Sequence, residues 1–578
     1  MDKESFNWKV AGFAGEGIVT TGLLFSKTCA RHGWYIFDYP EYPSLIRGGH
    51  NTYQVHAGKN PVYCQKITLD VLIALNKESL VVHQDELDEN SVVIYDQEDD
   101  DIDINRYHLA AKSINLPMTR LASEAGGEKV MGNNVALGAS IYLLGLDLEV
   151  LNQLIADVFA DKGEKVIGLN QRAAAAGFNF LKKETQPFMT IAKQEQKNLV
   201  TMTGNEAIAL GALAGGLQFF VAYPMTPSSS ILHFLAEKAP QTKIVVKHAE
   251  DEISAANMAL GASFAGARSM VATSGGGFCY MIEALGAAGI TELPLVVVEA
   301  MRPGPALGLP TWTAQGDLKF LVHASHDEFP RFVFAPSDAG EAFELSRKAL
   351  ELSEKYQVPA ILISDKYLSE SRYSFQLESS FFKNTRFGFE VSSKADTCGF
   401  YPRYRLTESG VSNRPIPGQP GGIHIVNTYE HDQYGFSNEE KDNKKIQVDK
   451  RFKKFELAKQ EVPTQFWEEE PQAILTFISF GSTKGVIRQA RSQLKNQGFA
   501  TNMLNLSWIW PFPQKQVEEV IKSSQDVVVV EGNSQGQLAS LITQETGIKI
   551  KNRLNRYDGR PFYPEEIVTY VKNFKKSL

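Results

Sequence analysis

Residues suited to binding a polar ligand occur at three nearby turns in the middle of the chain. The turns read Tyr223-Pro-Met-Thr-Pro-Ser-Ser-Ser230, Ala249-Glu-Asp-Glu252 and Ala272-Thr-Ser-Gly-Gly-Gly277. Hydroxyl groups at a helix start can bind polar groups, and glycines let the backbone approach a ligand closely. Each pattern alone is typical of a helix cap or a tight turn. Together they favour a binding site for a polar ligand.

The segments around these turns predict a parallel sheet. Strands are expected at 219–222, 243–246, 269–272, 295–299, 332–335 and 359–364, and helices at 230–239, 278–291 and 339–356, with another helix beginning at Glu250. This alternation predicts an α/β domain in which the turns face one cleft at the carboxyl edge of the sheet. Small residues of the helix at Glu250, from Ala255 to Ala262, predict a flat face that presses on another helix or on a subunit.

The ordered motifs of this region resemble those of a known family. They are Tyr223-Pro-Met-Thr-Pro-Ser-Ser229, Glu250-Asp-Glu252, Gly261-Ala-Ser-Phe-Ala-Gly-Ala-Arg268, Ala272-Thr-Ser-Gly-Gly-Gly277, Arg302-Pro-Gly-Pro-Ala-Leu-Gly-Leu-Pro-Thr311 and Gln315-Gly-Asp317. The chain resembles the alpha subunit of a 2-oxoacid:ferredoxin oxidoreductase with a gamma domain fused ahead of it. The resemblance extends over nearly the whole sequence.

The resemblance implies a multidomain α/β protein. A gamma domain on the coenzyme A side is expected at 1–190 and a thiamine-diphosphate-enzyme pyrimidine-type parallel-sheet domain at 199–375. An irregular arm is expected at 376–470, lying over neighbouring domains, and a transketolase C-terminal-like α/β domain at 471–578. The implied activity is coenzyme A-dependent oxidative decarboxylation of a 2-oxoacid, with electrons passed to ferredoxin.

The family's site residues transfer onto matching positions of this sequence. In the family, a glutamate hydrogen-bonds N1' of thiamine diphosphate and favours its imino tautomer. Counting back from Gly261 assigns this glutamate to Glu252, with Glu250 as the alternative. Tyr223, Pro224, Gly275 and Gly276 are further cofactor-binding candidates. If the resemblance is set aside, these acidic residues are typical of an ordinary first turn of a helix.

Substrate-binding candidates follow in the same way. Thr226, also a catalytic candidate, matches a threonine beside the substrate, and Arg302 and Thr311 match residues of the acyl pocket, where an arginine can clamp a carboxylate. The loop Arg302-Pro-Gly-Pro-Ala-Leu-Gly308 departs from the usual Arg-Gly-Gly-Pro-Ser-Thr-Gly and makes the pocket less polar. 2-Oxoglutarate is the first expected substrate, ahead of pyruvate or a branched-chain 2-oxoacid.

Coenzyme A candidates lie near the N-terminus. Gly12, Gly15 and Gly17 follow a predicted strand with the spacing G-x-x-G-x-G, which is not the dinucleotide fingerprint. Through the resemblance, Gly15, Gly17 and Arg47 are candidates for binding coenzyme A. A structural turn and a solvated arginine are the alternative interpretations.

The sequence also predicts a partner. It contains no Gly-Asp-Gly motif for a Mg2+–diphosphate site, so no metal ligand is assigned to this chain. The resembled beta subunit supplies Mg2+ and a 4Fe-4S cluster, so the cofactor is expected between the chains of an (alpha-beta)2 heterotetramer. A non-redox transketolase-type enzyme and a non-catalytic assembly subunit remain alternatives.

Composition narrows the class of protein. A net charge of -8 over 578 residues disfavours a nucleic-acid surface, and no apolar run reaches the ~18 residues that span a bilayer. The apolar run at 135–146 predicts a buried helix. The N-terminus lacks an apolar signal core, so a cytoplasmic location is expected. Cys29, Cys64, Cys279 and Cys398 are scattered, which predicts plain buried thiols and no zinc or cluster site.

Overall fold

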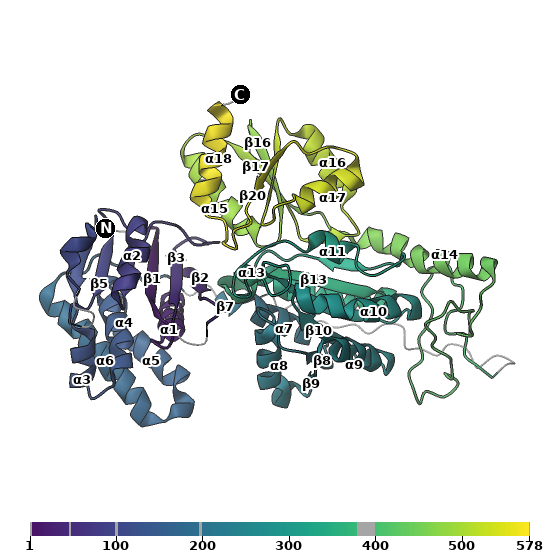
Figure 1. Ribbon diagram of the computed structural model, residues 1–578, viewed down its shortest axis with the longest axis horizontal. Helices are drawn as coiled ribbons and strands as arrows, with labels where there is room; N and C mark the ends of the chain where they lie inside the picture. Colours follow the sequence, from purple (N-terminus) through teal and green to yellow (C-terminus); the bar gives the residue numbers. More distant parts are fainter. Residues whose placement is uncertain (1–2, 46–47, 99–101, 196–198, 378–398, 577–578) are drawn as a thin grey trace.

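The computed structural model describes residues 3–45, 48–98, 102–195, 199–377 and 399–576, and these residues form three sheets (Figure 1). The first sheet lies at the N-terminal end, the second holds the predicted ligand-binding turns, and the third lies above both in Figure 1. Among these residues, no helix has the length and apolar character needed to cross a membrane.

The first sheet has the strand order β6-β5-β4-β1-β3-β2-β14-β7. Its N-terminal strands are β1 (Ser5–Phe13), β2 (Tyr35–Glu41), β3 (His50–Gly58), β4 (Val71–Ala74), β5 (Val92–Tyr95) and β6 (Lys112–Asn115). Its helices are α1 (Ile18–Arg31), α2 (Lys77–His83), α3 (Met118–Glu124), α4 (Gly132–Leu143), α5 (Leu148–Val158) and α6 (Glu164–Glu184). Helix α4 is buried along almost its whole length, which confirms the predicted buried helix.

Two strands tie the second unit to the first sheet. β7 (Leu199–Thr203) and β14 (Arg372–Gln376) flank the predicted second domain, pair with each other, and join the first sheet through β2. At this junction the backbone N–H of Arg372 donates to Asp38, and its guanidinium donates to Glu206 at 3.0 Å. The ends of the range 199–375 therefore belong to the sheet of the preceding unit.

The second sheet has the order β18-β12-β13-β11-β10-β8-β9 and is parallel except for β18. Its strands are β8 (Phe219–Ala222), β9 (Val245–His248), β10 (Ser269–Thr273), β11 (Leu295–Met301), β12 (Phe332–Phe334), β13 (Pro359–Asp365) and β18 (Trp508–Trp510). The accompanying helices are α7 (Gly204–Ala214), α8 (Ser229–Thr242), α9 (Glu252–Phe264), α10 (Gly275–Thr291), α11 (Leu318–Val322), α12 (Ala339–Tyr356) and α13 (Lys366–Glu370). The predicted parallel α/β sheet is confirmed.

Some element boundaries of this unit differ from the prediction. Helix α9 begins at Glu252 because the Asp251 side chain caps it by accepting a 2.7 Å hydrogen bond from the N–H of Ser254. Gly275 to Gly277 form the first turn of α10 and are not a separate glycine turn. Helix α8 begins at Ser229 and extends to Thr242, three residues beyond the predicted end.

The third sheet has the order β15-β17-β16-β19-β20. Its strands are β15 (Phe466–Glu468), β16 (Leu475–Phe480), β17 (Thr501–Leu506), β19 (Val527–Glu531) and β20 (Asn552–Asn555), and its helices are α15 (Thr483–Asn496), α16 (Gln514–Ser523), α17 (Gln537–Thr546) and α18 (Pro564–Lys576). All strand pairs are parallel except β15 with β17, as expected for a second α/β pattern.

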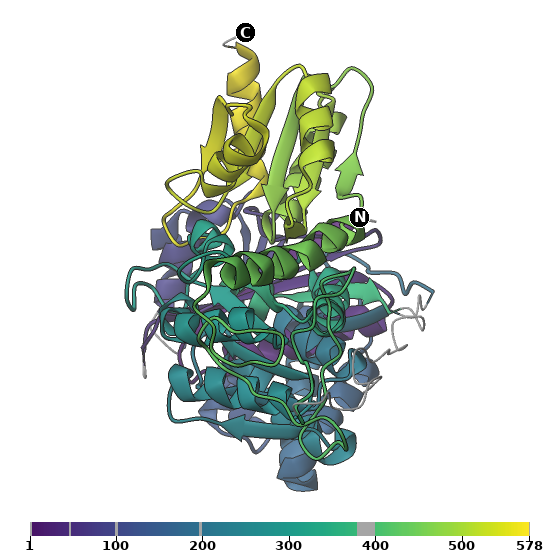
Figure 2. The same ribbon diagram turned by 90° about the vertical axis from the view of Figure 1, so that its right-hand side faces the viewer.

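The arm between the second and third sheets contains a long helix that was not predicted. α14 (Lys441–Ala458) runs along the second unit beneath the third sheet, as Figures 1 and 2 show. Lys450 and Lys454 of α14 both bind the buried carboxylate of Glu292 at the end of α10, with Nζ–O distances of 2.7 and 2.8 Å. These long-range ion pairs fix a helix whose own sequence lacks an apolar stripe.

The cysteines agree only partly with the prediction of buried thiols. Cys29 and Cys64 are buried, whereas Cys279 on the outer face of α10 is exposed, so the prediction is wrong for Cys279. Cys398 lies outside the described residues.

Candidate active site

The predicted site residues follow the carboxyl ends of three adjacent strands. β10 pairs in parallel with both β8 and β11, so the turns after these strands meet at one sheet edge. Thr226 follows β8, Gly275 follows β10 and Arg302 follows β11. The strand order therefore assembles residues that are nearly eighty positions apart in the sequence.

Glu252 is held at the start of α9 with its carboxyl group buried. The residue is 5% exposed, and within the described part of the chain its Oε1 has no hydrogen-bond partner. A Cβ atom on Gly277 would lie 2.7 Å from this Oε1, so the first turn of α10 packs directly on the acid. The alternative acid, Glu250, is exposed.

The small face of α9 explains why these two helix starts lie so close. Ala255, Ala256 and Ala259 are buried with Phe278 and Met281 of α10 in one apolar cluster. Alanine side chains let the helices approach closely, and α9 packs against α10. The predicted flat face therefore presses on a helix of the same chain.

Arg302 and Thr226 are brought together. The Arg302 Nη1 donates a 2.7 Å hydrogen bond to the backbone carbonyl of Thr226, and the arginine is largely buried. Burial lowers the pKa of Arg302, although the nearby Glu299 opposes this shift. The guanidinium is in no ion pair with any described residue, so its positive charge is available to an anion.

Other buried polar atoms of this edge also lack partners among the described residues. They are the hydroxyls of Ser274 and Thr311 and both carboxyl oxygens of Glu299. Ser274 is the N-cap residue of α10, yet its side chain does not cap the helix. Buried polar groups are normally hydrogen-bonded, so a cluster of exceptions indicates a place where a ligand supplies the partners. A buried acid beside glycines fits the aminopyrimidine ring of thiamine diphosphate.

Tyr223 and Pro224 lie in the segment that leaves β8, at the more open side of the edge. The Tyr223 side chain is exposed, and its ring centroid lies 6.3 Å from that of His248. Gly276 faces Ala306 of the loop after β11, whose carbonyl oxygen would lie 3.9 Å from an added Cβ. The glycine turn of α10 therefore lies under the predicted acyl-pocket loop.

The sequence predicted no role for three acidic residues near this loop. Burial raises the pKa of Asp317 to about 6 and also raises the pKa of Asp365. Burial, together with these two acids, raises the pKa of Glu299 well above its usual range. The sequence signal for Glu299 is an acid inside the otherwise apolar strand Leu295–Met301.

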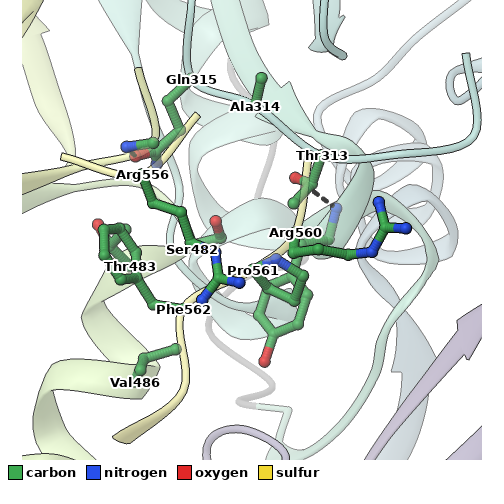
Figure 3. Close-up of a pocket in the computed structure, with 12 residues that line it drawn as sticks. Thr313, Ala314, Gln315, Ser482, Thr483, Val486, Arg556, Arg560, Pro561 and Phe562 are labelled. Carbon is green, nitrogen blue, oxygen red and sulfur yellow. Dashed lines mark hydrogen bonds between the residues drawn. The ribbon is translucent and has the colours of Figure 1, made fainter. Parts of the chain in front are cut away.

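The C-terminal unit covers the loop that follows Thr311. Figure 3 shows Thr313 and Gln315 of this loop facing Ser482, Thr483, Arg556 and Arg560 around a pocket. The N–H of Thr313 donates to the carbonyl of Gly559 at 3.1 Å, and the guanidinium of Arg560 lies over the ring of Trp312. Gln315 donates to Phe480 at 3.1 Å and accepts from the N–H of Gly532 at 2.8 Å.

Two of the coenzyme A candidates, Gly15 and Gly17, precede α1 of the first unit, and α1 lies away from α9 and α10 in Figure 1. Gly15 and Gly17 adopt φ values of 98° and 73° just before α1, a region that favours glycine. An added Cβ on Gly15 would meet nothing within 4 Å, whereas one on Gly17 would collide with Asn133. Gly17 thus has a structural reason to be glycine. Arg47 lies outside the described residues.

Three family models match successive segments of the chain. The family model "Pyruvate ferredoxin/flavodoxin oxidoreductase" matches residues 7–180, and "Pyruvate flavodoxin/ferredoxin oxidoreductase, thiamine diP-bdg" matches 210–452. "Pyruvate:ferredoxin oxidoreductase core domain II" matches 473–567. The alpha subunit of 2-oxoacid:ferredoxin oxidoreductase 2 from Aeropyrum pernix is 30% identical, over 97% of this chain and 96% of its own length.

The chain belongs to the alpha subunits of the 2-oxoacid:ferredoxin oxidoreductases. It is similar at 27% identity to the 2-oxoglutarate oxidoreductase subunit KorA of Mycobacterium tuberculosis, over 98% of this chain and 90% of that one. It is also similar to a solved structure of 2-oxoglutarate:ferredoxin oxidoreductase from Magnetococcus marinus, with 2-oxoglutarate, coenzyme A and succinyl-CoA bound. That similarity has a TM-score of 0.91 and 34% identity, over 99% of this chain and 100% of that one.

This alpha subunit therefore has the predicted family, fold class and enzyme class. It is part of an oxidoreductase, and its middle segment matches a thiamine-diphosphate-binding family model. The names of its relatives indicate a multisubunit enzyme.

Proposed function

We propose that this alpha subunit, with its fused gamma domain, acts with a beta subunit to convert 2-oxoglutarate and coenzyme A into succinyl-CoA and carbon dioxide. Two electrons pass singly to ferredoxin and one proton is released, which balances the reaction. The observation that carries the proposal is the buried carboxyl of Glu252, which has an oxygen against the first turn of α10 and without a hydrogen-bond partner among the described residues.

Glu252 is the proposed partner of the cofactor's aminopyrimidine ring. When bound, thiamine diphosphate supplies the carbon nucleophile that attacks the keto group and accepts the electron pair as carbon dioxide leaves. Oε1 of Glu252 holds the hydrogen bond to the ring nitrogen. Tyr223, Pro224, Gly275 and Gly276 are the further residues that would hold the cofactor. Gly275 also has a structural reason to be glycine, because an added Cβ would lie 2.5 Å from Oδ2 of Asp317.

Arg302 is the proposed anchor for a substrate carboxylate. It is largely buried, is fixed by the carbonyl of Thr226, and is in no ion pair with any described residue. An arginine in a dry pocket binds carboxylates through charge-assisted hydrogen bonds. The hydroxyls of Thr226 and Thr311 are proposed to orient the keto group. The 2-oxoglutarate named for the Magnetococcus enzyme supports this choice of substrate over pyruvate or a branched-chain 2-oxoacid.

A beta subunit is proposed to cover the same sheet edge. Large apolar side chains are exposed on the elements around the site, including Ile253 of α9, Tyr280 of α10 and Leu307, which is 74% exposed. Exposed apolar groups of this size are typical of interaction surfaces. The missing Gly-Asp-Gly motif points the same way, so Mg2+ and a 4Fe-4S cluster are assigned to the beta subunit. The assembly is proposed to be an (alpha-beta)2 heterotetramer.

Coenzyme A is proposed to be the second substrate, bound from the side of the first unit. Gly15 borders open space at the start of α1, and free N–H groups at a helix start can bind a phosphate. Gly17 shapes the turn. Arg47 remains a sequence-based candidate for this site.

The test is to purify the chain with its co-expressed beta subunit under anaerobic conditions and to record the visible spectrum. Bleaching of an iron–sulfur band that requires both 2-oxoglutarate and coenzyme A is the expected result. Bleaching with pyruvate alone among 2-oxoacids would overturn the substrate assignment. A colourless complex would favour a non-redox transketolase-type enzyme, and a coloured complex that no 2-oxoacid bleaches would favour a non-catalytic assembly subunit.

A further inference from the structure

Glu299 is a fully buried acid for which the proposed chemistry has no role. It lies on β11, opposite Thr273 of β10 and Ile363 of β13, and is 0% exposed. Neither carboxyl oxygen has a hydrogen-bond partner among the described residues. An ionised carboxylate without partners in such a place carries a very large desolvation cost, whereas a neutral acid does not.

Four titratable groups on the segments around Glu299 influence its charge. Asp317 precedes α11, Asp365 ends β13, and Cys279 lies on α10, and each disfavours a charge on Glu299. Of the groups that act most strongly on Glu299, Arg302, three residues further along the chain, favours the charge, and the two side chains form no ion pair. Burial and the two aspartates prevail, so the pKa of Glu299 is raised well above its ordinary value.

The surroundings of the two aspartates differ from those of Glu299. Asp365 accepts hydrogen bonds from the Ser482 hydroxyl at 2.5 Å and from the N–H of Leu368 at 2.8 Å. Asp317 lies beside the first turn of α10, where its Oδ2 would be 2.5 Å from an added Cβ on Gly275. Burial raises the pKa of Asp365, but these hydrogen bonds oppose the rise, whereas Glu299 has no such partners among the described residues. Glu299 is therefore the group that holds a proton.

We propose that Glu299 is a positioning residue for substrate affinity: as a neutral acid, it leaves the charge of Arg302 uncompensated for the carboxylate of the 2-oxoacid. An ionised Glu299 would attract the guanidinium away from Thr226 and would compete with the substrate for it. This inference rests on the proposed role of Arg302 in binding the substrate.

The direction of the pH effect follows from this arrangement. Glu299 is neutral below its raised pKa, so Arg302 is free and KM for the 2-oxoacid is low. As the pH rises through that pKa, the acid ionises, pairs with Arg302, and raises KM by about tenfold or more while kcat changes little. Bound substrate opposes this ionisation, because its carboxylate would lie beside a second negative charge.

The test uses the complex with the beta subunit and measures KM and kcat for 2-oxoglutarate from neutral to alkaline pH. Glu299→Gln carries an amide that cannot ionise, so the alkaline rise in KM is expected to disappear. Asp317→Asn removes a neighbouring negative charge, so the rise is expected to shift to lower pH. An unchanged KM profile in both variants would overturn the inference.

Infrared difference spectroscopy gives a readout that is independent of turnover. The wild-type chain is expected to show the C=O stretch of a protonated carboxylic acid at neutral pH, and Glu299→Gln is expected to lose it. A spectrum without such a difference would show that Glu299 is ionised and would refute the proposal.

Arg302→Gln separates this inference from the proposed function. If Arg302 binds the substrate, this variant raises KM at every pH. A wild-type KM would refute the proposed substrate pose, whereas the infrared band would still report on the protonation of Glu299.

Discussion

Two acids, Glu250 and Glu252, lie two positions apart, yet only Glu252 is buried. Asp251 caps α9 between them, so Glu252 is the first helical residue and turns toward α10, while Glu250 remains in solvent. An acid that holds a cofactor proton must be fixed and shielded from water, and only Glu252 meets this condition.

We expect Glu252→Gln to lower kcat of the complex by about 10²–10⁴-fold, because the amide keeps the shape of the site but cannot exchange a proton. The measurement is the rate of 2-oxoacid-dependent reduction of an artificial electron acceptor, with cofactor binding followed separately by calorimetry. Glu250→Gln is the matched control and should retain wild-type kcat. Loss of activity in the control alone would move the cofactor acid to position 250.

At the scale of elements, the first turn of α10 packs directly against Glu252, the proposed cofactor acid. An added Cβ at Gly277 would lie 2.1 Å from the Thr273 hydroxyl and 2.8 Å from Cγ of Glu252. We expect Gly277→Ala to lower the free energy of unfolding by about 1–3 kcal/mol through overpacking and to weaken thiamine diphosphate binding. Chemical denaturation and calorimetric titration of the complex measure the two effects.

Gly261 on α9 is the control for this substitution. It also lies in a helix, but an added Cβ would meet nothing within 4 Å in this chain. Gly261→Ala should raise the free energy of unfolding of the isolated chain by about 0.5–1 kcal/mol, because alanine loses less conformational entropy than glycine. Equal destabilisation by both alanines would refute the steric argument.

Helix α14 depends on one buried carboxylate. Glu292 binds Lys450 and Lys454, and all three side chains are at least 98% buried. Although burial raises the pKa of Glu292, the attraction of the two lysines outweighs it and holds the pKa well below its usual range. This stabilisation is present above the unfolded-state pKa and is lost as the pH falls through the folded-state value.

We expect Glu292→Gln to lower the free energy of unfolding by about 3–5 kcal/mol, because it leaves two buried ammonium groups uncompensated. Proteolysis of the arm should accelerate in parallel. Asp449→Asn on the same helix breaks an exposed pair with Lys445 and should cost less than about 1 kcal/mol. Comparable losses in the two variants would show that the buried cluster is not what holds α14.

The sequence predicted six of the seven strands of the second sheet and most of its helices, because alternating apolar runs and caps are local signals; it did not predict β18. It did not predict α14, whose stability comes from Glu292, more than 150 residues away. The motifs likewise identified Thr226 and Arg302, whereas the role of Glu299 depends on three elements that only the fold brings together. Long-range charge and packing thus account for what local patterns missed.

At the scale of the whole molecule, strands from one unit join the sheet of a neighbouring unit. β7 and β14 extend the first sheet, and β18 from the C-terminal region pairs with β12 at the edge of the second sheet. A domain boundary placed from the sequence therefore does not separate independent sheets. Backbone hydrogen bonds thus join the neighbouring units.

Gln315 links the C-terminal unit to the predicted acyl-pocket loop through several hydrogen bonds. Its side chain bridges Phe480 and Gly532, its N–H donates to Gly532 at 2.7 Å, and its carbonyl accepts from Asn533 at 3.1 Å. The residue lies only four positions after Thr311. The C-terminal unit therefore helps to set the position of the acyl-pocket loop.

We expect Gln315→Ala to raise KM for the 2-oxoacid severalfold and to lower the free energy of unfolding by about 1–3 kcal/mol, because two buried backbone groups lose their partners. Gln516→Ala removes a similar pair of hydrogen bonds, to the backbone of Gln465, but within the C-terminal unit itself. If the C-terminal unit positions the substrate loop, the Gln516 variant loses stability and keeps its KM. A rise in KM in both variants would mean that general loosening of the C-terminal unit, and not the Gln315 bridge, controls the loop.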